Sequence, residues 1–137
     1  DDLGLIAAID WLKEQYNKRT DIDFQMKMPD EDININGEHA TAIFRIAQEA
    51  LTKIMRHSNA KNVIIKMELK KTNILLKVED DGKGIGKNNN TIHNKTFGVF
   101  SMKERATSLG GKLDIRNNIG KGTTVNLMLP YDQLEKA

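Results

Sequence analysis

Apolar residues recur at intervals of three and four positions in three stretches of the chain, a spacing typical of helices that bury one face. The first predicted helix covers residues 3–20 and the second about residues 38–58. The third has its apolar positions within residues 99–109 and is followed by Gly110-Gly111, a pair that stops helices. The pattern therefore predicts three amphipathic helices.

Alternation of apolar and polar residues marks five further segments, and a period of two predicts half-buried strands. These segments are residues 22–28, 63–69, 74–78, 113–116 and 124–129. The predicted order is α-β-α-β-β-α-β-β, without an internal repeat or a domain boundary. We therefore predict one domain over residues 1–137, an α/β two-layer sandwich (α+β) in which three helices cover one face of a mixed sheet of about five strands.

Composition restricts the partners and the compartment. A net charge of +2 favours neither nucleic acid nor an anionic membrane as a partner. The chain has no cysteine, no signal peptide and no apolar run near the roughly 18 residues of a membrane span. We therefore expect a cytoplasmic location without direct membrane contact from this segment. Because the chain begins with Asp1 rather than Met, we expect a piece of a longer protein, and a membrane anchor elsewhere in it stays open.

A buried carboxylate is predicted at the end of the strand in ILLKVEDDGKGIG. Strand parity places Asp80 on the apolar face that Ile74 and Val78 form, and points Asp81 the other way. A carboxylate on that face is costly unless it is paired, and it could accept a hydrogen bond from an exocyclic amine such as that of adenine. The three glycines that follow allow a tight turn and close approach of a flat ligand. The alternative is a simple turn in which backbone amides satisfy Asp80.

The segment FGVFSMKERA combines a loop with a capped helix. Ser101 and Glu104 match a capping box, so we predict that the third helix begins at Met102 with Ser101 as its N-cap. Gly98 lies just upstream, where loop amides and the helix N-terminus could face a phosphate. An ordinary capped helix after a loop is the alternative.

Three charged or titratable residues follow one another at steps of four in QEALTKIMRH: Glu49, Lys53 and His57. On a helix they lie on one side, spread over about 12 Å. Glu49 and Lys53 also form a favourable i,i+4 pair worth roughly a few tenths of a kcal/mol. The row is either a solvated helix face or one wall of a site.

Taken in order, these motifs resemble the ATP-binding domain of the GHKL superfamily, which includes gyrase, MutL-type and histidine-kinase ATPases. The similarity is greatest to the catalytic domain of sensor histidine kinases of the nitrate-sensor and desaturase-sensor type. The N box is matched by RIAQEALTKIMRHSNA, the first glycine box by EDDGKGIG, the second by FGVFSMKERATSLGG and the closing GxGT strand by NIGKGTTVNLMLP. The resemblance covers essentially residues 1–130 and implies the Bergerat ATP-binding fold.

The resemblance implies roles for the residues of an adenine pocket. Asp80 would bind the adenine amine, and Thr123 would lie beside the base together with it. Gly82 and Gly84 would shape the pocket. Residues 87–97 would form a lid that nucleotide orders.

The resemblance also implies a phosphate side. Gly98 would lie at the phosphates where the lid joins the third helix. On the N-box helix, Glu49 would face the reacting γ-phosphate and His57 would lie near the phosphate chain. The implied reaction transfers the γ-phosphoryl group of ATP to a histidine on an upstream dimerisation domain, with Mg²⁺ neutralising charge. The implied partners are this phosphoacceptor domain of the same kinase and a response regulator.

Two positions depart from the family pattern. Lys53 stands where the family has the asparagine that holds Mg²⁺, and an ammonium has no acceptor with which to coordinate a cation. Lys53 could neutralise phosphate charge instead, so we count it with the nucleotide-binding residues and expect Mg²⁺ dependence to be weakened. It also favours the alternative of a degenerate GHKL module that binds nucleotide or a partner without catalysis. Ser101 replaces a glycine of the second glycine box. We expect no self-phosphorylation of this chain, since none of its histidines lies in a phosphoacceptor motif.

Overall fold

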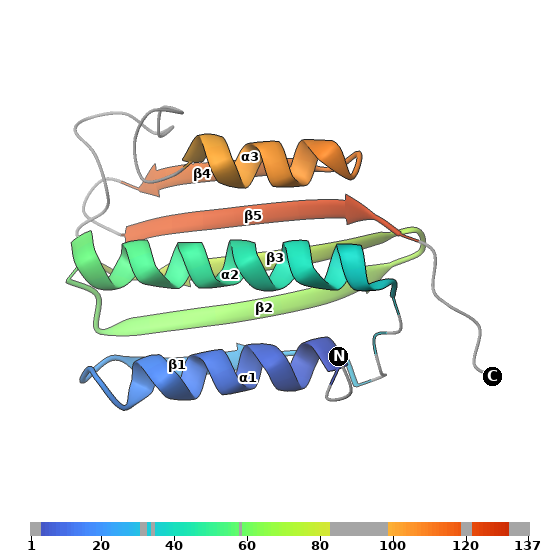
Figure 1. Ribbon diagram of the computed structural model, residues 1–137. Helices are drawn as coiled ribbons and strands as arrows, with labels where there is room; N and C mark the ends of the chain where they lie inside the picture. Colours follow the sequence, from blue (N-terminus) through green and yellow to red (C-terminus); the bar gives the residue numbers. More distant parts are fainter. Residues whose placement is uncertain are drawn as a thin grey trace.

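The computed structural model describes residues 4–30, 33, 35–57, 59–82, 99–118 and 122–131, and of residues 56–57 and 117–118 it describes the backbone only. The described elements follow the predicted order (Figure 1). The helices are α1 (Gly4–Asn17), α2 (Gly37–His57) and α3 (Val99–Ser108). The strands are β1 (Asp23–Lys27), β2 (Asn62–Lys70), β3 (Asn73–Asp80), β4 (Lys112–Asn118) and β5 (Gly122–Pro130).

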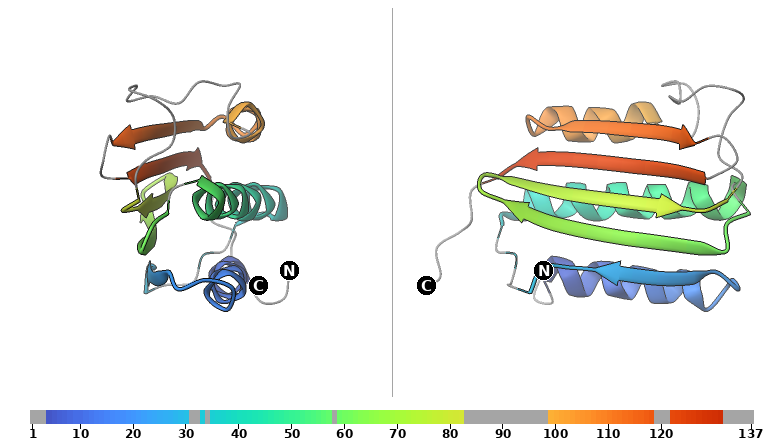
Figure 2. Two further views of the ribbon diagram at one scale, coloured as in Figure 1. Left: turned by 90° about the vertical axis from the view of Figure 1, so that its left-hand side faces the viewer. Right: turned by 180° about the vertical axis from the view of Figure 1, so that it is seen from behind.

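The strands form one mixed sheet in the order β1-β2-β3-β5-β4. β1 pairs with β2 in parallel, and every other neighbouring pair is antiparallel. The side view in Figure 2 shows all three described helices on one face of this sheet, and the view from behind shows none of them on the other face. This arrangement confirms the predicted two-layer sandwich with a mixed sheet of five strands and three helices on one face.

The core lies between the helices and the sheet, as the two periodicities require. Along β3, Ile74, Leu76 and Val78 point to the helices and are 2% exposed or less. Helix α2 supplies the opposite wall, and its buried residues are Ala42, Ile43, Ile46, Ala47, Ala50, Leu51 and Ile54. Full burial of one such Ile or Leu side chain contributes about 1.5–3 kcal/mol relative to exposure. Burial of this stripe therefore holds α2 against the centre of the sheet.

The predicted start of the third helix is wrong. Helix α3 begins at Val99, three residues before Met102, so Ser101 lies inside the helix rather than at its N-cap. Val99 is fully buried, and with Met102 and Ala106 it forms one apolar stripe against the sheet. Burial of Val99 extends the helix beyond the point where local capping chemistry alone would begin it.

The predicted end of this helix is confirmed. The Gly111 N–H donates to the Ala106 carbonyl at 2.9 Å and the Gly110 N–H donates to the Thr107 carbonyl at 2.9 Å, the bond pair of a Schellman motif. Gly110 has φ +78°, a conformation that favours glycine. The turn leads the chain directly into β4.

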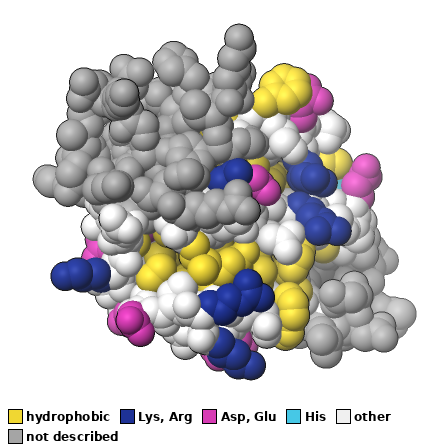
Figure 3. Space-filling view, turned by 60° about the vertical axis from the view of Figure 1, so that its left-hand side comes forward, with side chains coloured by type: hydrophobic (Ala, Val, Ile, Leu, Met, Phe, Trp, Pro, Cys, Tyr) yellow, Lys and Arg dark blue, Asp and Glu magenta, His cyan; other side chains and the backbone are white. Residues whose placement is uncertain are grey.

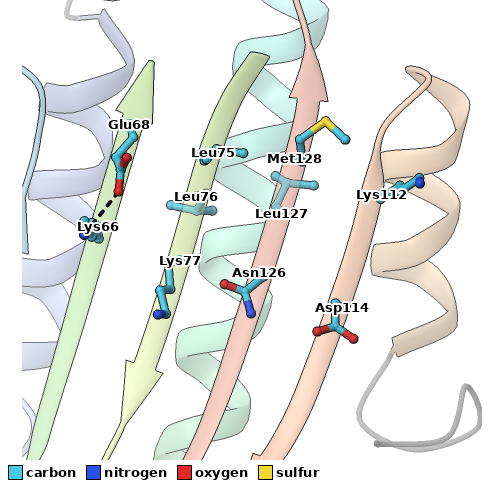
Figure 4. A pocket seen from close by; sticks show the side chains of 10 residues that line it. All are labelled: Lys66, Glu68, Leu75, Leu76, Lys77, Lys112, Asp114, Asn126, Leu127 and Met128. Atoms are coloured by element: carbon cyan, nitrogen blue, oxygen red, sulfur yellow. Dashed lines mark ion pairs between the residues drawn. The ribbon is translucent and has the colours of Figure 1, made fainter. Parts of the chain in front are cut away.

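A shallow cavity of about 350 Å³ lies on strands β2, β3, β5 and β4 (Figure 4). Charged side chains of the uncovered sheet face surround Leu75 and Met128 there, and Lys66 Nζ lies 3.1 Å from Glu68 Oε1. None of the predicted site residues lines this cavity. The predicted site therefore has to be sought on the helical side of the sheet.

Candidate functional site

Asp80 ends β3 with its side chain turned into the interior, as strand parity predicts, and only 3% of the residue is exposed. The Gly82 N–H donates to Asp80 Oδ1 at 2.7 Å, and the Thr123 N–H donates to Oδ2 at 3.3 Å. Backbone amides therefore bind the carboxylate, as the turn alternative expects.

Thr123 has an unusual hydroxyl beside this carboxylate. The residue is 1% exposed, and its Oγ1 has no hydrogen-bond partner among the described residues. An unsatisfied buried polar atom costs about 1–3 kcal/mol. Because the backbone of the same residue binds Asp80, a ligand or an ordered water that reached Asp80 could also satisfy this hydroxyl.

Gly122 makes the approach of β5 to β3 possible. Its φ of +98° disfavours other residues, and a Cβ placed on it would lie 1.9 Å from the Asp80 carbonyl oxygen and 2.9 Å from Asp80 Oδ1. Gly122 was not among the predicted site residues. The available signal was its place immediately before Thr123, in a motif already matched to the closing strand of a nucleotide pocket.

Asp81 points away from the core, as predicted, and fastens the end of β3 to the start of β2. Its carboxylate accepts hydrogen bonds from the Lys61 N–H (2.9 Å), the Asn62 N–H (2.9 Å) and the Asn62 side-chain amide (2.8 Å). The amide and the N–H of Asn62 are the main reasons that the pKa of Asp81 is lowered from its ordinary value. The two adjacent aspartates therefore have different environments.

The charged row on α2 is only partly described. Lys53 Nζ lies 3.4 Å from Glu49 Oε1, so the predicted i,i+4 pair is present. His57 is the last residue of α2, and its side chain lies outside the described residues. Gly84, Gly98 and the predicted lid at 87–97 also lie outside them.

The predicted adenine residues and the end of the N-box helix α2 lie on the same side of the molecule. Asp80, Gly82 and Thr123 meet where β3 ends and β5 begins, and α2 ends on that side as well (Figure 1). The space-filling view of this side shows hydrophobic side chains gathered at the surface, with Lys and Arg side chains near them (Figure 3).

The described residues do not provide a metal site. No group of three or more His, Cys, Asp or Glu side chains lies close enough to hold a metal within the part of the chain that the structure describes. At the position implied for Mg²⁺, the Lys53 ammonium faces the Glu49 carboxylate, and an ammonium offers no lone pair. Mg²⁺ therefore does not fit at Lys53. No helix among the described residues is long and apolar enough to cross a membrane.

Comparison with known proteins gives a consistent result. The model of the family described as histidine kinase-, DNA gyrase B-, and HSP90-like ATPase matches residues 38–133. The chain is 36% identical over 134 residues to the signal transduction histidine-protein kinase/phosphatase DegS of Bacillus subtilis, covering 95% of this chain and 35% of that protein. It is 31% identical to the oxygen sensor histidine kinase NreB of Staphylococcus carnosus, covering 95% and 37%. The chain thus spans about a third of the length of these relatives.

Solved structures share the fold. The ATP binding domain of PrrB from Mycobacterium tuberculosis aligns with a TM-score of 0.71 at 14% identity, covering 93% of each chain. The blue-light activated histidine kinase EL346 of Erythrobacter litoralis aligns with a TM-score of 0.75 at 21% identity, covering 92% of this chain and 40% of that one. At these identities the likeness supports the fold alone.

Proposed function

Since the chain belongs to the family of histidine kinase-, DNA gyrase B- and HSP90-like ATPases, we propose that it donates the γ-phosphoryl group of ATP to a histidine on a phosphoacceptor domain of the same kinase. Its relatives are sensor histidine kinases, so the predicted family is confirmed and the chain is a catalytic domain of this kind. The alternative of a degenerate, non-catalytic module has no support among these relatives.

The observation that carries the proposal is a buried carboxylate, Asp80, bound by the backbone N–H of Thr123, whose own buried hydroxyl has no hydrogen-bond partner among the described residues. Adenine carries an exocyclic amine next to a ring nitrogen, a donor beside an acceptor. Asp80 offers the acceptor for the amine, and the Thr123 hydroxyl can donate to the ring nitrogen directly or through water. In this proposal Gly82 shapes the pocket beside the base, and Gly84 and Gly98, which lie outside the described residues, keep the roles that the resemblance implies.

The reaction needs a proton acceptor and positive charge near the γ-phosphate. A ring nitrogen of the acceptor histidine attacks the γ-phosphorus, the bond to the β–γ bridging oxygen breaks, and ADP leaves. The ring also gives up the proton of its other nitrogen, and we assign Glu49 as the acceptor. Lys53 neutralises phosphate charge as a point charge, and His57, whose side chain lies outside the described residues, keeps the role near the phosphate chain that the resemblance implies.

Partners follow from the same reasoning. A histidine that receives the phosphoryl group lies on a dimerisation domain, and a response regulator then takes the group from it. In this proposal Lys53 supplies positive charge at its own position, and Mg²⁺ brought by the nucleotide would neutralise phosphate charge without a ligand from Lys53.

Calorimetric titration of this chain with a non-hydrolysable ATP analogue tests the adenine site. We expect the unmodified chain to bind and Asp80→Asn to weaken binding by about 100-fold, roughly 2.7 kcal/mol. The reason is that an amide has one acceptor oxygen for three donors: the Gly82 N–H, the Thr123 N–H and the adenine amine. Asp81→Asn is the matched control and should bind normally. Equal affinity of the two variants, or no binding by the unmodified chain, would contradict the proposal.

A further inference from the structure

A cleft of about 470 Å³ lies between α2 and α3, on the helical face of the molecule. Helix α2 lines one side with Arg45, Gln48 and Glu49, and α3 lines the other with Ser101 and Arg105. Figure 1 shows α3 beside β4 and α2 over β3, with β5 lying between the two helices. The cleft shares Glu49 with the proposed phosphate side, so whatever enters the cleft comes next to the proposed reacting group.

The cleft has an excess of positive charge. Neither Arg45 nor Arg105 has a carboxylate within ion-pair distance among the described residues, although six other ion pairs are present there. Arg45 Nη1 donates to Gln48 Oε1 at 3.2 Å, which orients one guanidinium along the cleft. Glu49 is the carboxylate of the cleft, and Lys53 already pairs with it. Within the part of the chain that the structure describes, two guanidinium groups on opposite walls are therefore left without an ion-pair partner.

The position of the arginines favours a protein partner over the nucleotide. Arg45 lies eight residues before Lys53, about 12 Å along the helix and away from the end at which Asp80 lies. Arg105 lies in the last turn of α3, at the opposite end of the helix from the predicted phosphate residue Gly98. Both arginines therefore lie toward the helix ends that are remote from the adenine site, in the same cleft as Glu49.

We propose that this cleft binds carboxylate side chains of the phosphoacceptor domain and so positions its histidine beside Glu49. The inference rests on the proposed function. Guanidinium groups bind carboxylates through two parallel hydrogen bonds, which fix orientation as well as distance. A partner helix with an acidic residue on each side of its histidine face would meet one arginine on each wall. Arg45 and Arg105 are thus positioning residues.

The test uses the full-length kinase that carries this domain, and measures histidine phosphorylation from radiolabelled ATP. Charge reversal by Arg45→Glu with Arg105→Glu should lower the phosphorylation rate by about tenfold or more, because attraction becomes repulsion. The matched control is Arg19→Glu, an exposed reversal just after α1, and it should leave the rate within about twofold of the unmodified kinase. Rising salt should slow the unmodified kinase more than the double variant, since it screens only an attraction that exists.

Nucleotide affinity of each variant separates this inference from the proposed function. ATP-analogue binding should stay within about twofold in the double variant, because the arginines lie beyond the nucleotide. Reversal of acidic residues on the acceptor domain to Lys should restore part of the lost rate. An unchanged rate in the double variant, or a rate loss matched by an equal loss of nucleotide affinity, would overturn the inference. Absence of phosphorylation in the unmodified kinase would instead refute the proposed function.

Discussion

The adenine end and the phosphate side of the proposed site are held in different ways. At the adenine end, backbone N–H groups of Gly82 and Thr123 hold a carboxylate that is 3% exposed. On α2, Glu49 is held by one side-chain ion pair to Lys53, and the two side chains are 40% and 20% exposed. The first arrangement is pre-organised by the fold. The second contributes at most about 1 kcal/mol, so it can open at little cost when a phosphate competes for Lys53.

Gly122→Ala should have the largest effect, because it disrupts the contact between β5 and Asp80 at the adenine end. The new Cβ would lie 1.9 Å from the Asp80 carbonyl oxygen, and φ +98° adds backbone strain. We expect the free energy of unfolding to fall by about 3 kcal/mol or more and nucleotide binding to be lost. Urea denaturation and calorimetry measure the two effects. Gly37→Ala is the control, since no atom lies within 4 Å of its Cβ position. Unchanged stability and unchanged nucleotide affinity of Gly122→Ala would contradict this expectation.

Thr123→Val should separate binding from stability. Valine keeps the shape of threonine and removes the buried hydroxyl that has no partner among the described residues. Stability should stay level or rise by up to about 1 kcal/mol, because an unsatisfied polar atom is removed. Affinity for the ATP analogue should fall by roughly tenfold, the value of one hydrogen bond. A matching loss of stability would show that the hydroxyl has a structural role instead.

Lys53→Asn tests the phosphate side of the proposed site, where a side-chain ion pair holds Glu49. The unmodified chain should bind an ATP analogue almost equally with and without Mg²⁺, because Lys53 already supplies a positive charge at that position. The variant offers an amide oxygen to the metal, and Mg²⁺ should then raise affinity by about fivefold. Titrations in Mg²⁺ and in EDTA measure both ratios. Strong Mg²⁺ dependence of the unmodified chain would contradict the role given to Lys53.

The same comparison shows what the sequence could predict. Asp80 and Asp81 were assigned to opposite faces correctly, because side-chain direction in a strand depends only on parity. The Glu49–Lys53 pair was predicted from helical spacing for the same reason. Both are local consequences of secondary structure, so no knowledge of tertiary contacts was needed.

The remaining features depend on contacts between distant residues. Thr123 and Asp80 lie 43 positions apart and were placed together by the family resemblance, not by a local pattern. The need for glycine at residue 122 was not predicted, because it exists only where β5 passes beside β3. The α3 start was misplaced because burial of Val99 is a tertiary effect. Arg45 and Arg105 became a pair only when α2 and α3 were placed side by side.

Asp81→Asn should have the smallest effect on nucleotide binding, because Asp81 points to the opposite face of the strand from Asp80. Asparagine keeps the shape but loses the charge that accepts hydrogen bonds from Lys61 and Asn62. We expect about 1 kcal/mol less stability at pH 7, a modest value because solvent screens this exposed carboxylate, and nucleotide affinity within about twofold of normal.

The stability lost in Asp81→Asn should depend on pH. Since the pKa of Asp81 is lower in the folded than in the unfolded chain, its contribution is fully present above the unfolded pKa of about 3.9 and is lost as pH falls through the folded value. The stability difference between the unmodified chain and Asp81→Asn should therefore be largest near neutral pH and shrink below about pH 4. Urea denaturation at pH 7, 5 and 3 measures it. A difference that stays constant with pH would mean that the asparagine disturbs packing rather than removing a charge-assisted hydrogen bond.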